Sequence, residues 1–421
     1  MHIILVAIGS VGDVHPLVGI GLALKKKGHS VVVLTSGYFE SMMKETGLDV
    51  HPIGTAEDYL AVLNKMNMTA PFKLRPIICD NLFVRPMKPV YDYISAHHHR
   101  GNTVVVCSIS AMGARLANEK LGVPMISINV SPMMCKSTIN PPRVTPWENP
   151  RWLPRWGYQA IFHLVDTRFD REICPALNDF RKEIGLPPQR GVLQWVHSPD
   201  KIIGVFPDWY ASPEADWPRQ TELTGFLLFD EAKVNDAPLP AAVESFLKAG
   251  SPPILFTPGT PNKKAASFFQ AAAEATMTLG RRAIFLTKYP EQVPSGLPPE
   301  ILFLEYLPFS QVFPRIALLV HHGGIGTLAQ ALKAGLPQLI VPWGLDQYDN
   351  ASRIKALGVG DELGKKDCHA AALADKIKSI LDSRALHEKC AYYADKFKGA
   401  DAIGDVCRII ETYGREKCKK T

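Results

Sequence analysis

The stretch His322-Gly323-Gly324-Ile325-Gly326-Thr327 follows the apolar run from Ile316 to Val320 and decides how the rest of this chain is interpreted. Glycines between a buried strand and an amphipathic segment let the backbone approach an anion closely. A helix that starts there points its free N–H groups and the positive end of its dipole at that anion. The pattern therefore predicts a diphosphate-binding turn, although an ordinary strand-to-helix turn can have the same glycine content.

The chain is long enough for two domains, because it has 421 residues, 46% of them hydrophobic, and single cores stop growing near roughly 250–300 residues. Seven prolines between Pro207 and Pro253 interrupt the middle of the chain and mark the connection between the domains. We predict a first domain over 1–232, a linker over 233–252 and a second domain over 253–400. A C-terminal helix over 401–421 could pack back on the first domain.

Short apolar strands alternate with helical patterns in both halves, which is typical of a doubly wound parallel sheet. The fold class is therefore α/β, with two Rossmann-like domains. The predicted strands are 2–8, 30–35, 103–107, 124–130, 201–206 and 222–228, then 253–257, 282–287, 301–304, 316–320 and 338–341. The predicted helices are 16–27, 38–46, 111–121 and 158–184, then 263–278, 328–334, 346–357, 370–381, 384–397 and 401–413.

Charge and cysteine content narrow the class of partner and the compartment. The net charge of +6 is spread along the chain without arginine-rich blocks, so we expect no nucleic-acid partner. The eight cysteines show neither paired nor zinc-type spacing, which indicates reduced thiols in a cytoplasmic protein. No signal peptide or apolar run long enough to span a bilayer is evident. The lysine-rich end leaves two interpretations open, a solvated basic surface and peripheral contact with the anionic inner face of a membrane.

A second glycine-containing turn, Gly9-Ser10-Val11-Gly12-Asp13-Val14-His15-Pro16, joins the first predicted strand to the first predicted helix. Asp13 would lie at the carboxyl end of a parallel strand, where open α/β sheets bind ligands, and could act there as a catalytic base. It could also simply cap the helix. The turn lacks the third glycine of the dinucleotide-binding fingerprint.

Together and in this order, the two motifs resemble the GT-B fold glycosyltransferases that use nucleotide sugars. Gly9-Ser-x-Gly-Asp-Val-x-Pro16 is similar to the start of the antibiotic and sterol glycosyltransferases. His321-His322-Gly-Gly-x-Gly-Thr327 through Asp346-Gln347-x-x-Asn350 is similar to their donor signature. The resemblance covers nearly the whole chain and implies two Rossmann-like domains that face each other across a cleft.

A narrower likeness points to the rhamnosyltransferases of rhamnolipid synthesis. It rests on Ala7-Ile8-Gly9-Ser10, Pro89-Val90-Tyr91, Gln194-Trp195-Val196-His197-Ser198-Pro199, and Trp217-Pro218 with Thr224-Gly225-Phe226. This likeness favours dTDP-rhamnose as donor, whereas the broader family favours UDP-glucose.

The resemblance also implies roles for individual residues. Asp13 would be the general base that takes the proton of the acceptor hydroxyl, with His15 as an alternative base. The donor diphosphate would be held by His322, Gly324, Gly326, Thr327 and Thr260. No metal is expected, because the chain contains no Asp-x-Asp pair, and no cofactor is expected beyond the nucleotide-sugar co-substrate. His321 would point away from the site, because alternate strand residues face opposite sides.

Four further residues are implied on the donor side. Asp346 and Gln347 match the pair that binds the sugar hydroxyls, although an acidic helix N-terminus would look similar. Tyr306 matches the aromatic that stacks on the nucleobase, although an aromatic between strands is core in most proteins. Gln330 stands where many uridine-nucleotide enzymes carry a ribose-binding glutamate, so UDP and dTDP both remain open.

The predicted function is a metal-independent, inverting transfer of a hexose to a hydroxyl of a small hydrophobic acceptor, such as a hydroxy fatty acid lipid, a sterol or a phenol. The alternatives are a sugar-nucleotide epimerase of the same fold and a non-catalytic sugar-nucleotide binding protein. Apolar residues that could contact the acceptor, or simply pack in the core, are Phe72, Leu74, Ile77, Ile78, Leu82, Phe83 and Pro132-Met133-Met134.

Overall fold

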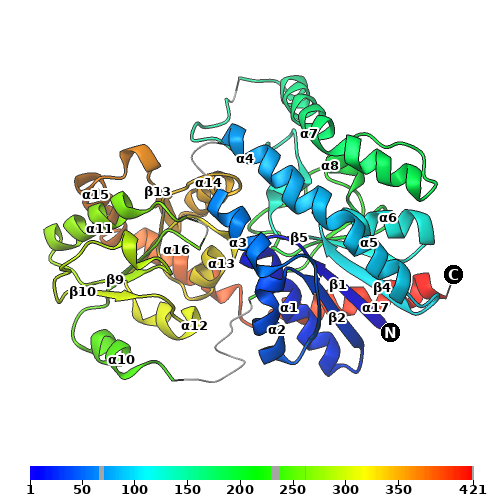
Figure 1. Cartoon of the computed structure of the whole chain (residues 1–421). Helices are drawn as coiled ribbons and strands as arrows, with labels where there is room; N and C mark the ends of the chain where they lie inside the picture. The colour runs from blue at the N-terminus through cyan, green and yellow to red at the C-terminus, as the bar shows by residue number, and fades with distance from the viewer. Residues whose placement is uncertain (66–70, 151, 229–237, 261, 420–421) are drawn as a thin grey trace. The chain divides into compact units, whose positions relative to one another are not determined.

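The computed structural model describes the chain except residues 66–70, 151, 229–237, 261 and 420–421, and it leaves out the side chains of 71–74. The chain forms two compact units (Figure 1). The first comprises Met1–Pro142, Asn149–Phe229 and Asp401–Thr421, and the second comprises Arg143–Glu148 and Asp230–Ala400. The short segment 143–148 thus belongs to the second unit, although the sequence-based division places it inside the first domain.

A seven-stranded parallel sheet forms the centre of the first unit, in the order β3-β2-β1-β4-β5-β6-β7. Its strands are β1 (His2–Ala7), β2 (Ser30–Thr35), β3 (Asp49–Pro52), β4 (Thr103–Ser108), β5 (Met125–Asn129), β6 (Ile202–Gly204) and β7 (Thr221–Leu223). The strand order reverses between β1 and β4, which pair in register with Leu5 beside Val106. Open α/β sheets bind ligands at such a reversal.

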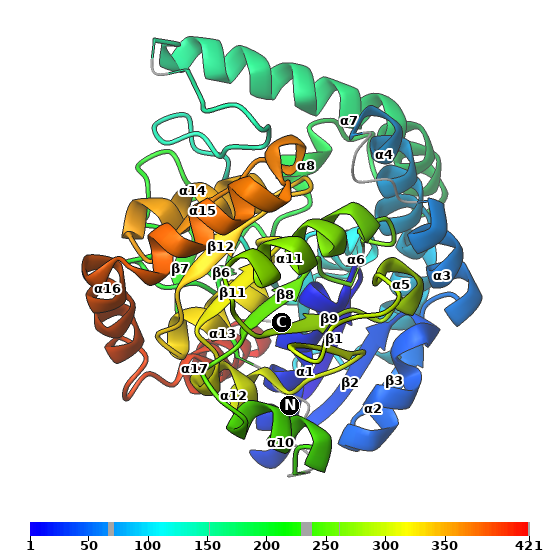
Figure 2. The same ribbon diagram turned by 90° about the vertical axis from the view of Figure 1, so that its left-hand side faces the viewer.

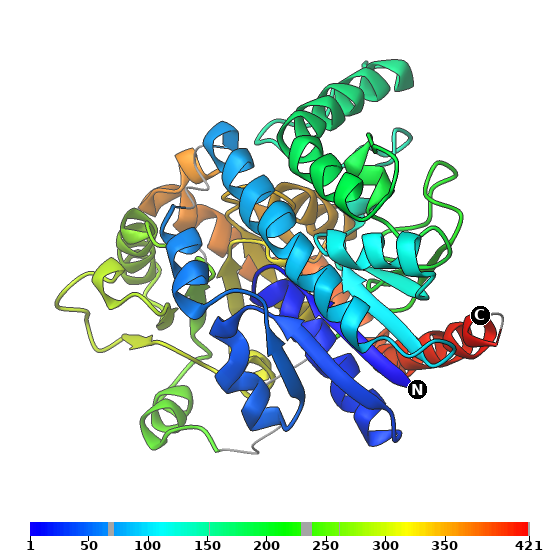
Figure 3. The same cartoon turned by 45° about the vertical axis from the view of Figure 1, so that its right-hand side comes forward.

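Strand β1 divides its apolar side chains between two cores, because successive residues of a strand face opposite sides. Ile4 and Val6 belong to one core, and Ile3 and Leu5 to the other. Each fully buried aliphatic side chain contributes roughly 1.5–3 kcal/mol. The first core is covered by α4 (Pro71–Ile78), the π-helical turn η2 (Cys79–Val84), α5 (Arg85–His97), α6 (Met112–Leu121), α7 (Arg155–Glu183) and α8 (Val192–Trp195). Figure 3 shows α5 running across this face of the sheet.

The opposite face of this sheet is covered by helices from both ends of the chain. They are α1 (Val11–Lys26), η1 (Gly37–Phe39), α2 (Glu40–Thr46), α3 (Ala56–Lys65) and α17 (Ala402–Cys418). In α17, Ile409 and Ile410 join the same core as Leu17 of α1. Tyr413 donates from its hydroxyl to Asp200 at 3.2 Å, so residues 401–421 form part of the first unit.

The second unit contains a six-stranded parallel sheet in the order β10-β9-β8-β11-β12-β13. Its strands are β8 (Ile254–Thr257), β9 (Ala283–Leu286), β10 (Ile301–Leu304), β11 (Leu318–His321), β12 (Gln338–Ile340) and β13 (Gly360–Glu362). The order reverses between β8 and β11, where Leu255 lies beside Leu319. This sheet therefore also has a crevice position at the carboxyl ends of its central strands.

Helices cover both faces of this sheet as well. Leu255 packs with α10 (Ala241–Lys248), α12 (Phe309–Val312) and α13 (Ile325–Lys333), whereas Phe256 packs against Phe268 of α11 (Ala266–Thr278). Figure 2 shows α11 and α15 beside the strands. The remaining helices are α14 (Gln347–Leu357), α15 (Ala370–Leu381) and α16 (Arg384–Asp395), and the short turns are η3 (Pro132–Cys135), η4 (Pro290–Gln292), η5 (Phe313–Arg315) and η6 (Lys365–Asp367).

The structure differs from the sequence-based expectations in three places. Helix α1 begins at Val11 rather than near Pro16, so Asp13 lies in its first turn. The predicted linker 233–252 contains α10, whose Val243 and Leu247 pack in the second core, while 233–237 lie outside the described residues. The expectations also missed β3, β13 and the helices between 56 and 97, because short edge strands and helices that contain prolines carry weak periodicity.

Candidate active site

The turn after β1 carries the first group of candidate residues. Ser10 is the N-cap of α1, and its backbone N–H donates to Oδ2 of Asp13 at 2.8 Å. The Ser10 hydroxyl donates to the same oxygen at 3.0 Å. Asp13 therefore does cap the helix, as one of the two interpretations predicted. Its other carboxylate oxygen is not needed for this cap, so capping leaves room for a second role.

Gly9 makes this arrangement possible. Its backbone φ of +146° is one that residues other than glycine rarely adopt. A Cβ at this position would lie 2.3 Å from Oδ2 of Asp13. The carboxylate of Asp13 thus fills the space that the missing side chain leaves. The glycine of this motif sets the position of the aspartate as well as the path of the chain.

Two serines at the end of β4 hold the end of β1, and sequence reasoning missed them. The hydroxyls of Ser108 and Ser110 both donate to the carbonyl of Ile8, at 3.2 and 2.7 Å. They fix the end of β1 just before the Gly9 turn. The available signal was their position at the carboxyl end of the strand that neighbours β1 at the reversal.

Burial raises the pKa of Asp13 above the ordinary value of 3.8, and the two hydrogen bonds from Ser10 oppose that rise. A carboxylate with a raised pKa is a better proton acceptor from a weakly acidic hydroxyl than a fully solvated one. The side chain keeps partial solvent exposure, so a substrate can approach it. His15, the alternative base, lies two residues further along the same helix.

The second group of candidates lies where the strand order reverses in the second unit. The His322 imidazole sits between the turn after β8 and the start of α13. A Cβ on Gly259 would lie 2.5 Å from this ring, and one on Gly324 would lie 2.5 Å from its Nε2. Both glycines are therefore needed for the ring to occupy this position.

His322 carries a buried nitrogen that has no hydrogen-bond partner within the described residues. Its Nδ1 is inaccessible to solvent and unpaired there, which costs about 1–3 kcal/mol unless a ligand satisfies it. Burial also lowers the pKa of His322 to about 4, so the ring is neutral at physiological pH. No side chain caps α13 at Gly324, and the first N–H groups of a helix lack partners within it. A neutral ring and free N–H groups together suit an anionic ligand.

His321 has a different role from its neighbour. It is fully buried, its Nδ1 accepts from the N–H of Gly323 at 3.2 Å, and its Nε2 lies 3.0 Å from the side-chain oxygen of Gln338. Because Nδ1 accepts, the proton lies on Nε2 and the ring is neutral; burial lowers its pKa to about 3. His321 is therefore a packed side chain, and its expected direction away from the site stays a prediction.

The residues predicted to bind the sugar begin helix α14. Asp346 is its N-cap, and Asn350 donates from Nδ2 to Asp346 at 3.1 Å and to the carbonyl of Gly323 at 2.9 Å. Asn350 therefore ties the start of α14 to the glycine turn, a role that its place in the motif had not revealed. The side-chain oxygen of Gln347 accepts from the N–H of Trp343 at 2.8 Å. Gln347 is 5% exposed, and this bond does not use its amide NH₂.

The other predicted donor residues lie on neighbouring loops and on α13. Tyr306 follows β10 and its side chain is 54% exposed, so it is not a core aromatic. Thr260 follows Gly259, and its carbonyl accepts from the hydroxyl of Tyr289 at 3.1 Å. Gln330 lies on α13 beyond Gly326 and Thr327. All three belong to the second unit, and Tyr306 and Thr260 follow the ends of β10 and β8 within three residues.

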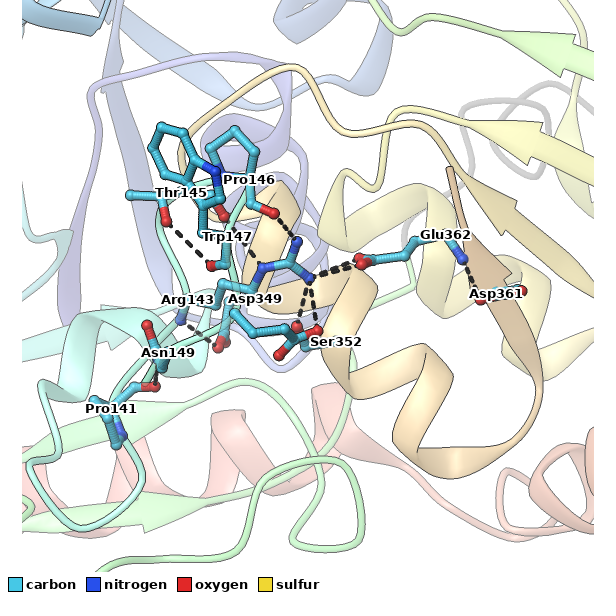
Figure 4. Close-up of polar contacts among 11 residues, drawn as sticks. Pro141, Arg143, Thr145, Pro146, Trp147, Asn149, Asp349, Ser352, Asp361 and Glu362 are labelled. Atoms are coloured by element: carbon cyan, nitrogen blue, oxygen red, sulfur yellow. Dashed lines mark hydrogen bonds and ion pairs between the residues drawn. The ribbon is translucent and has the colours of Figure 1, made fainter. Parts of the chain in front are cut away.

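An arginine that sequence reasoning missed supports α14 (Figure 4). Arg143, in the segment 143–148 of the second unit, is 6% exposed. Its backbone N–H donates to Oδ1 of Asp349 at 3.2 Å, and its Nη1 donates to Ser352 at 3.1 Å and to both oxygens of Glu362 at 2.9 and 2.8 Å. Arg143 thereby joins α14 to the end of β13. A lone arginine in a proline-rich stretch carries no sequence signal for such a role.

Some of the residues predicted to contact the acceptor pack in the core, and others remain partly exposed. Residue 70 and the side chains of Phe72 and Leu74 lie outside the described part of the chain. Phe83 is 6% exposed and packs in the first core, with Ile78 and Leu82 partly buried against it. Met133 and Met134, in η3, keep partial exposure. Core packing therefore accounts for Phe83, whereas the methionines stay available to a ligand.

Within the described residues, no group of three or more histidine, cysteine, aspartate or glutamate side chains is placed to hold a metal ion. In the same part of the chain, no helix has the length and apolarity required to cross a membrane.

Comparison with known families matches both halves of the chain. Residues 3–139 match the glycosyltransferase family 28 N-terminal domain, and residues 284–410 match the erythromycin biosynthesis protein CIII-like C-terminal domain. The first match contains the Asp13 turn, and the second contains the His322 turn and the start of α14.

Curated relatives align over most of the chain. The chain is 25% identical to the O-mycaminosyltylonolide 6-deoxyallosyltransferase of Streptomyces fradiae, over 99% of this chain and 98% of the relative. It is 28% identical to a sterol 3-beta-glucosyltransferase of Arabidopsis thaliana, over 91% of this chain and 62% of the relative.

Solved structures show the same fold. The glycotransferase of kitacinnamycin superposes with a TM-score of 0.76 at 18% identity, covering 98% of both chains. The spinosyn rhamnosyltransferase SpnG, complexed with thymidine diphosphate, superposes with a TM-score of 0.70 at 17% identity, covering 98% of this chain and 100% of the other.

Proposed function

We propose that this chain, a glycosyltransferase of the GT-B fold, transfers a hexose from a nucleoside diphosphate sugar to a hydroxyl of a small hydrophobic acceptor, with inversion at the anomeric carbon. The proposed donor-binding site rests on one observation, the arrangement of His322 and the start of α13, which we call the diphosphate seat. It combines an unpartnered buried nitrogen, a neutral ring and an uncapped helix start. Such groups stabilise the charge that grows on a departing diphosphate.

In this mechanism Asp13 accepts the proton of the acceptor hydroxyl as its oxygen attacks the anomeric carbon of the donor. The bond from that carbon to the diphosphate oxygen breaks, and the diphosphate leaves with the electron pair. A single displacement from the opposite side inverts the anomeric centre. The raised pKa of Asp13 and its fixed position beside Ser10 support this assignment.

No metal ion takes part in the proposed reaction. The hydrogen-bond donors of His322, Thr327 and the α13 N-terminus would stabilise the leaving group that a divalent cation stabilises elsewhere. The test is turnover in the presence of excess EDTA, which should be unchanged. Loss of turnover that Mg²⁺ or Mn²⁺ restores would contradict this part of the proposal.

We propose a dTDP-hexose, such as dTDP-rhamnose, as the first donor to test, with UDP-glucose as the second. Support comes from related structures that are complexes with thymidine diphosphate, among them SpnG and VinC. Gln330 adds to this, because a neutral amide grips a ribose diol less strongly than a carboxylate does. The acceptor class is proposed from the names of the relatives, which include sterol glucosyltransferases and an antibiotic-modifying enzyme.

The deciding experiment supplies dTDP- and UDP-hexoses with hydroxy fatty acids, sterols and phenols, and measures free nucleoside diphosphate together with the product mass. Acceptor-dependent release and a product with inverted anomeric configuration by NMR would support the proposal. A donor whose stereochemistry changes without any acceptor would instead identify an epimerase. Donor binding without any turnover would favour a binding protein.

We also propose that the protein is cytoplasmic and makes peripheral contact with the inner face of a membrane, because a hydrophobic acceptor would be concentrated there.

A further inference from the structure

The first half of helix α7 carries an exposed apolar surface. Trp152, just before the helix, is 80% exposed, and Trp156, in its first turn, is 71% exposed. Ile161, Leu164 and Val165 follow at 46, 53 and 37% exposure. Large apolar side chains gathered in one short segment mark an interaction surface more often than chance exposure does. Figures 1 and 2 show α7 running along the outside of its unit.

Helical spacing places these aliphatic side chains on one side of α7. Ile161, Leu164 and Val165 are three and four residues apart and therefore share a face. The other side, which carries Ile173 and Leu177 further along the helix, packs in the first core. The inward side is thus packed in the first core, whereas Ile161, Leu164 and Val165 keep 46, 53 and 37% exposure. Trp156 lies on an adjacent side of the helix, and Trp152 precedes the helix. We call the exposed surface of this segment the α7 outer face, defined by Trp152, Trp156, Ile161, Leu164 and Val165.

The charges around the α7 outer face are basic. Between 152 and 171 the exposed charged residues are Arg155, Arg168 and Arg171, and Arg155 forms an ion pair with Asp216 at 3.8 Å. The acidic side chains of this stretch are used by the protein itself. Asp166 pairs with Lys136, and Asp170 accepts from the N–H groups of Gly191 and Val192 at 2.8 and 2.9 Å. The surface that solvent meets therefore combines apolar groups with positive charge.

We propose that the α7 outer face docks the protein on an anionic lipid bilayer. Tryptophans favour the headgroup level of a bilayer, where their rings meet both apolar and polar surroundings. A helix with aliphatic and aromatic residues beside arginines is typical of segments that lie in the plane of the membrane surface. The arginines would be attracted by the negative potential of anionic lipids. Docking there would place the protein beside hydrophobic molecules dissolved in the membrane, and it does not depend on which residue is the catalytic base.

The test is co-sedimentation of the full chain with vesicles of phosphatidylcholine alone and of phosphatidylcholine mixed with phosphatidylglycerol. We expect binding to the anionic vesicles that weakens as salt is raised. The double variant Trp152→Ala/Trp156→Ala should lower the partition coefficient on the order of tenfold or more, as should Leu164→Glu. The double variant Arg168→Glu/Arg171→Glu should remove the preference for anionic lipid.

The control is Tyr392→Ala on α16, an aromatic of 52% exposure in the second unit, which should leave vesicle binding unchanged. Leu164→Glu changes an exposed position, so it keeps the test informative if the tryptophan variant unfolds. Absence of binding by the unaltered protein, or equal binding by the folded variants, would overturn the proposal. So would a concentration-dependent dimer in sedimentation velocity that the same variants abolish, because the face would then be an interface between two copies.

Discussion

The backbone N–H of Arg143 donates to Oδ1 of Asp349, and this bond joins a segment from the middle of the chain to the first turn of α14. The same carboxylate accepts from Nε of Arg353 at 2.7 Å through its other oxygen. Both Asp349 and Arg143 are buried. The start of α14, with Asp346 and Gln347, is therefore held by a charged network that lies outside the glycine turn.

We expect Arg143→Met to weaken nucleotide-sugar binding roughly tenfold or more, because breaking one side of a buried ion pair leaves the other charge uncompensated and lets α14 shift. Binding of the free nucleoside diphosphate should change far less, because the proposed diphosphate seat belongs to α13. Calorimetric titration with dTDP or UDP and with the corresponding sugar nucleotide separates the two effects. Arg143→Lys should restore part of the lost affinity for the nucleotide sugar, since lysine keeps the positive charge but not the planar, two-pronged geometry of the guanidinium group.

Arg315→Met provides the matched control, because Arg315 makes a two-pronged ion pair with Glu244 of α10, at 2.7 and 3.0 Å, in the same unit. It should alter neither affinity. An equal loss of both affinities in Arg143→Met would mean that Arg143 supports the unit as a whole rather than the sugar-binding residues.

Asp13→Asn should remove turnover while donor binding persists. The amide can still accept the hydrogen bonds from Ser10, but it cannot take a proton, so kcat should fall on the order of 10²–10⁴-fold. His15→Gln serves as the comparison and should retain most activity. The reverse pattern, with His15→Gln inactive and Asp13→Asn active, would assign the base to His15.

The pH dependence of catalysis should follow from the same carboxyl. A base works only when ionised, so kcat/KM should fall as the pH drops through the pKa of Asp13, which burial places above 3.8. The stability of the fold should change with pH in the opposite direction. Because the pKa of Asp13 is raised in the folded state, the folded state binds more protons than the unfolded state in that pH range, and the free energy of unfolding falls as pH rises. Urea unfolding at neutral pH should therefore show Asp13→Asn to be more stable than the unaltered protein.

Gly259→Ala should disrupt the donor seat, because its Cβ would collide with the His322 ring. The change also introduces a side chain at a φ of +81°. Gly280→Ala controls for that backbone strain, because Gly280 has a φ of +57° and, among the described residues beyond its chain neighbours, no atom lies within 4 Å of the added Cβ. Nucleoside diphosphate affinity should fall in the first variant only. Similar losses in both would show that strain, not the collision, is responsible.

Acid should destabilise the fold through its buried histidines. Burial lowers the pKa values of His197 and His322 to about 4 and that of His321 to about 3. Between these values and 6.5 the unfolded chain binds more protons, so the free energy of unfolding should fall as pH is lowered from 6.5 toward 4. His197→Leu should reduce this pH dependence in urea titrations, whereas the exposed His163→Leu should not. An unchanged slope in His197→Leu would mean that its pKa is not lowered in the folded state.

The sequence predicted the structure best where a glycine-containing turn follows a strand at the centre of a sheet. The glycine turns at Gly9 and Gly323 each follow a buried strand and precede a helix, and the structure places both beside a reversal of strand order. The alternation of strand side chains separated His322 from His321. The start of α1 was misplaced, at Pro16 instead of Val11, because a proline favours a first turn but is also accommodated within this helix.

The sequence by itself determined the fold class, since periodicity and glycine placement are local properties. Residue chemistry, which is also local, predicted which residues react. The tertiary structure alone decided which groups support them. Ser108 and Ser110, at the end of β4, reach Ile8 at the end of the neighbouring β1. Asn350 reaches Gly323, and Arg143 reaches Asp349 across more than two hundred residues of chain. These contacts depend on strand order and on segments that meet only after folding, and no local pattern in the chain encodes them.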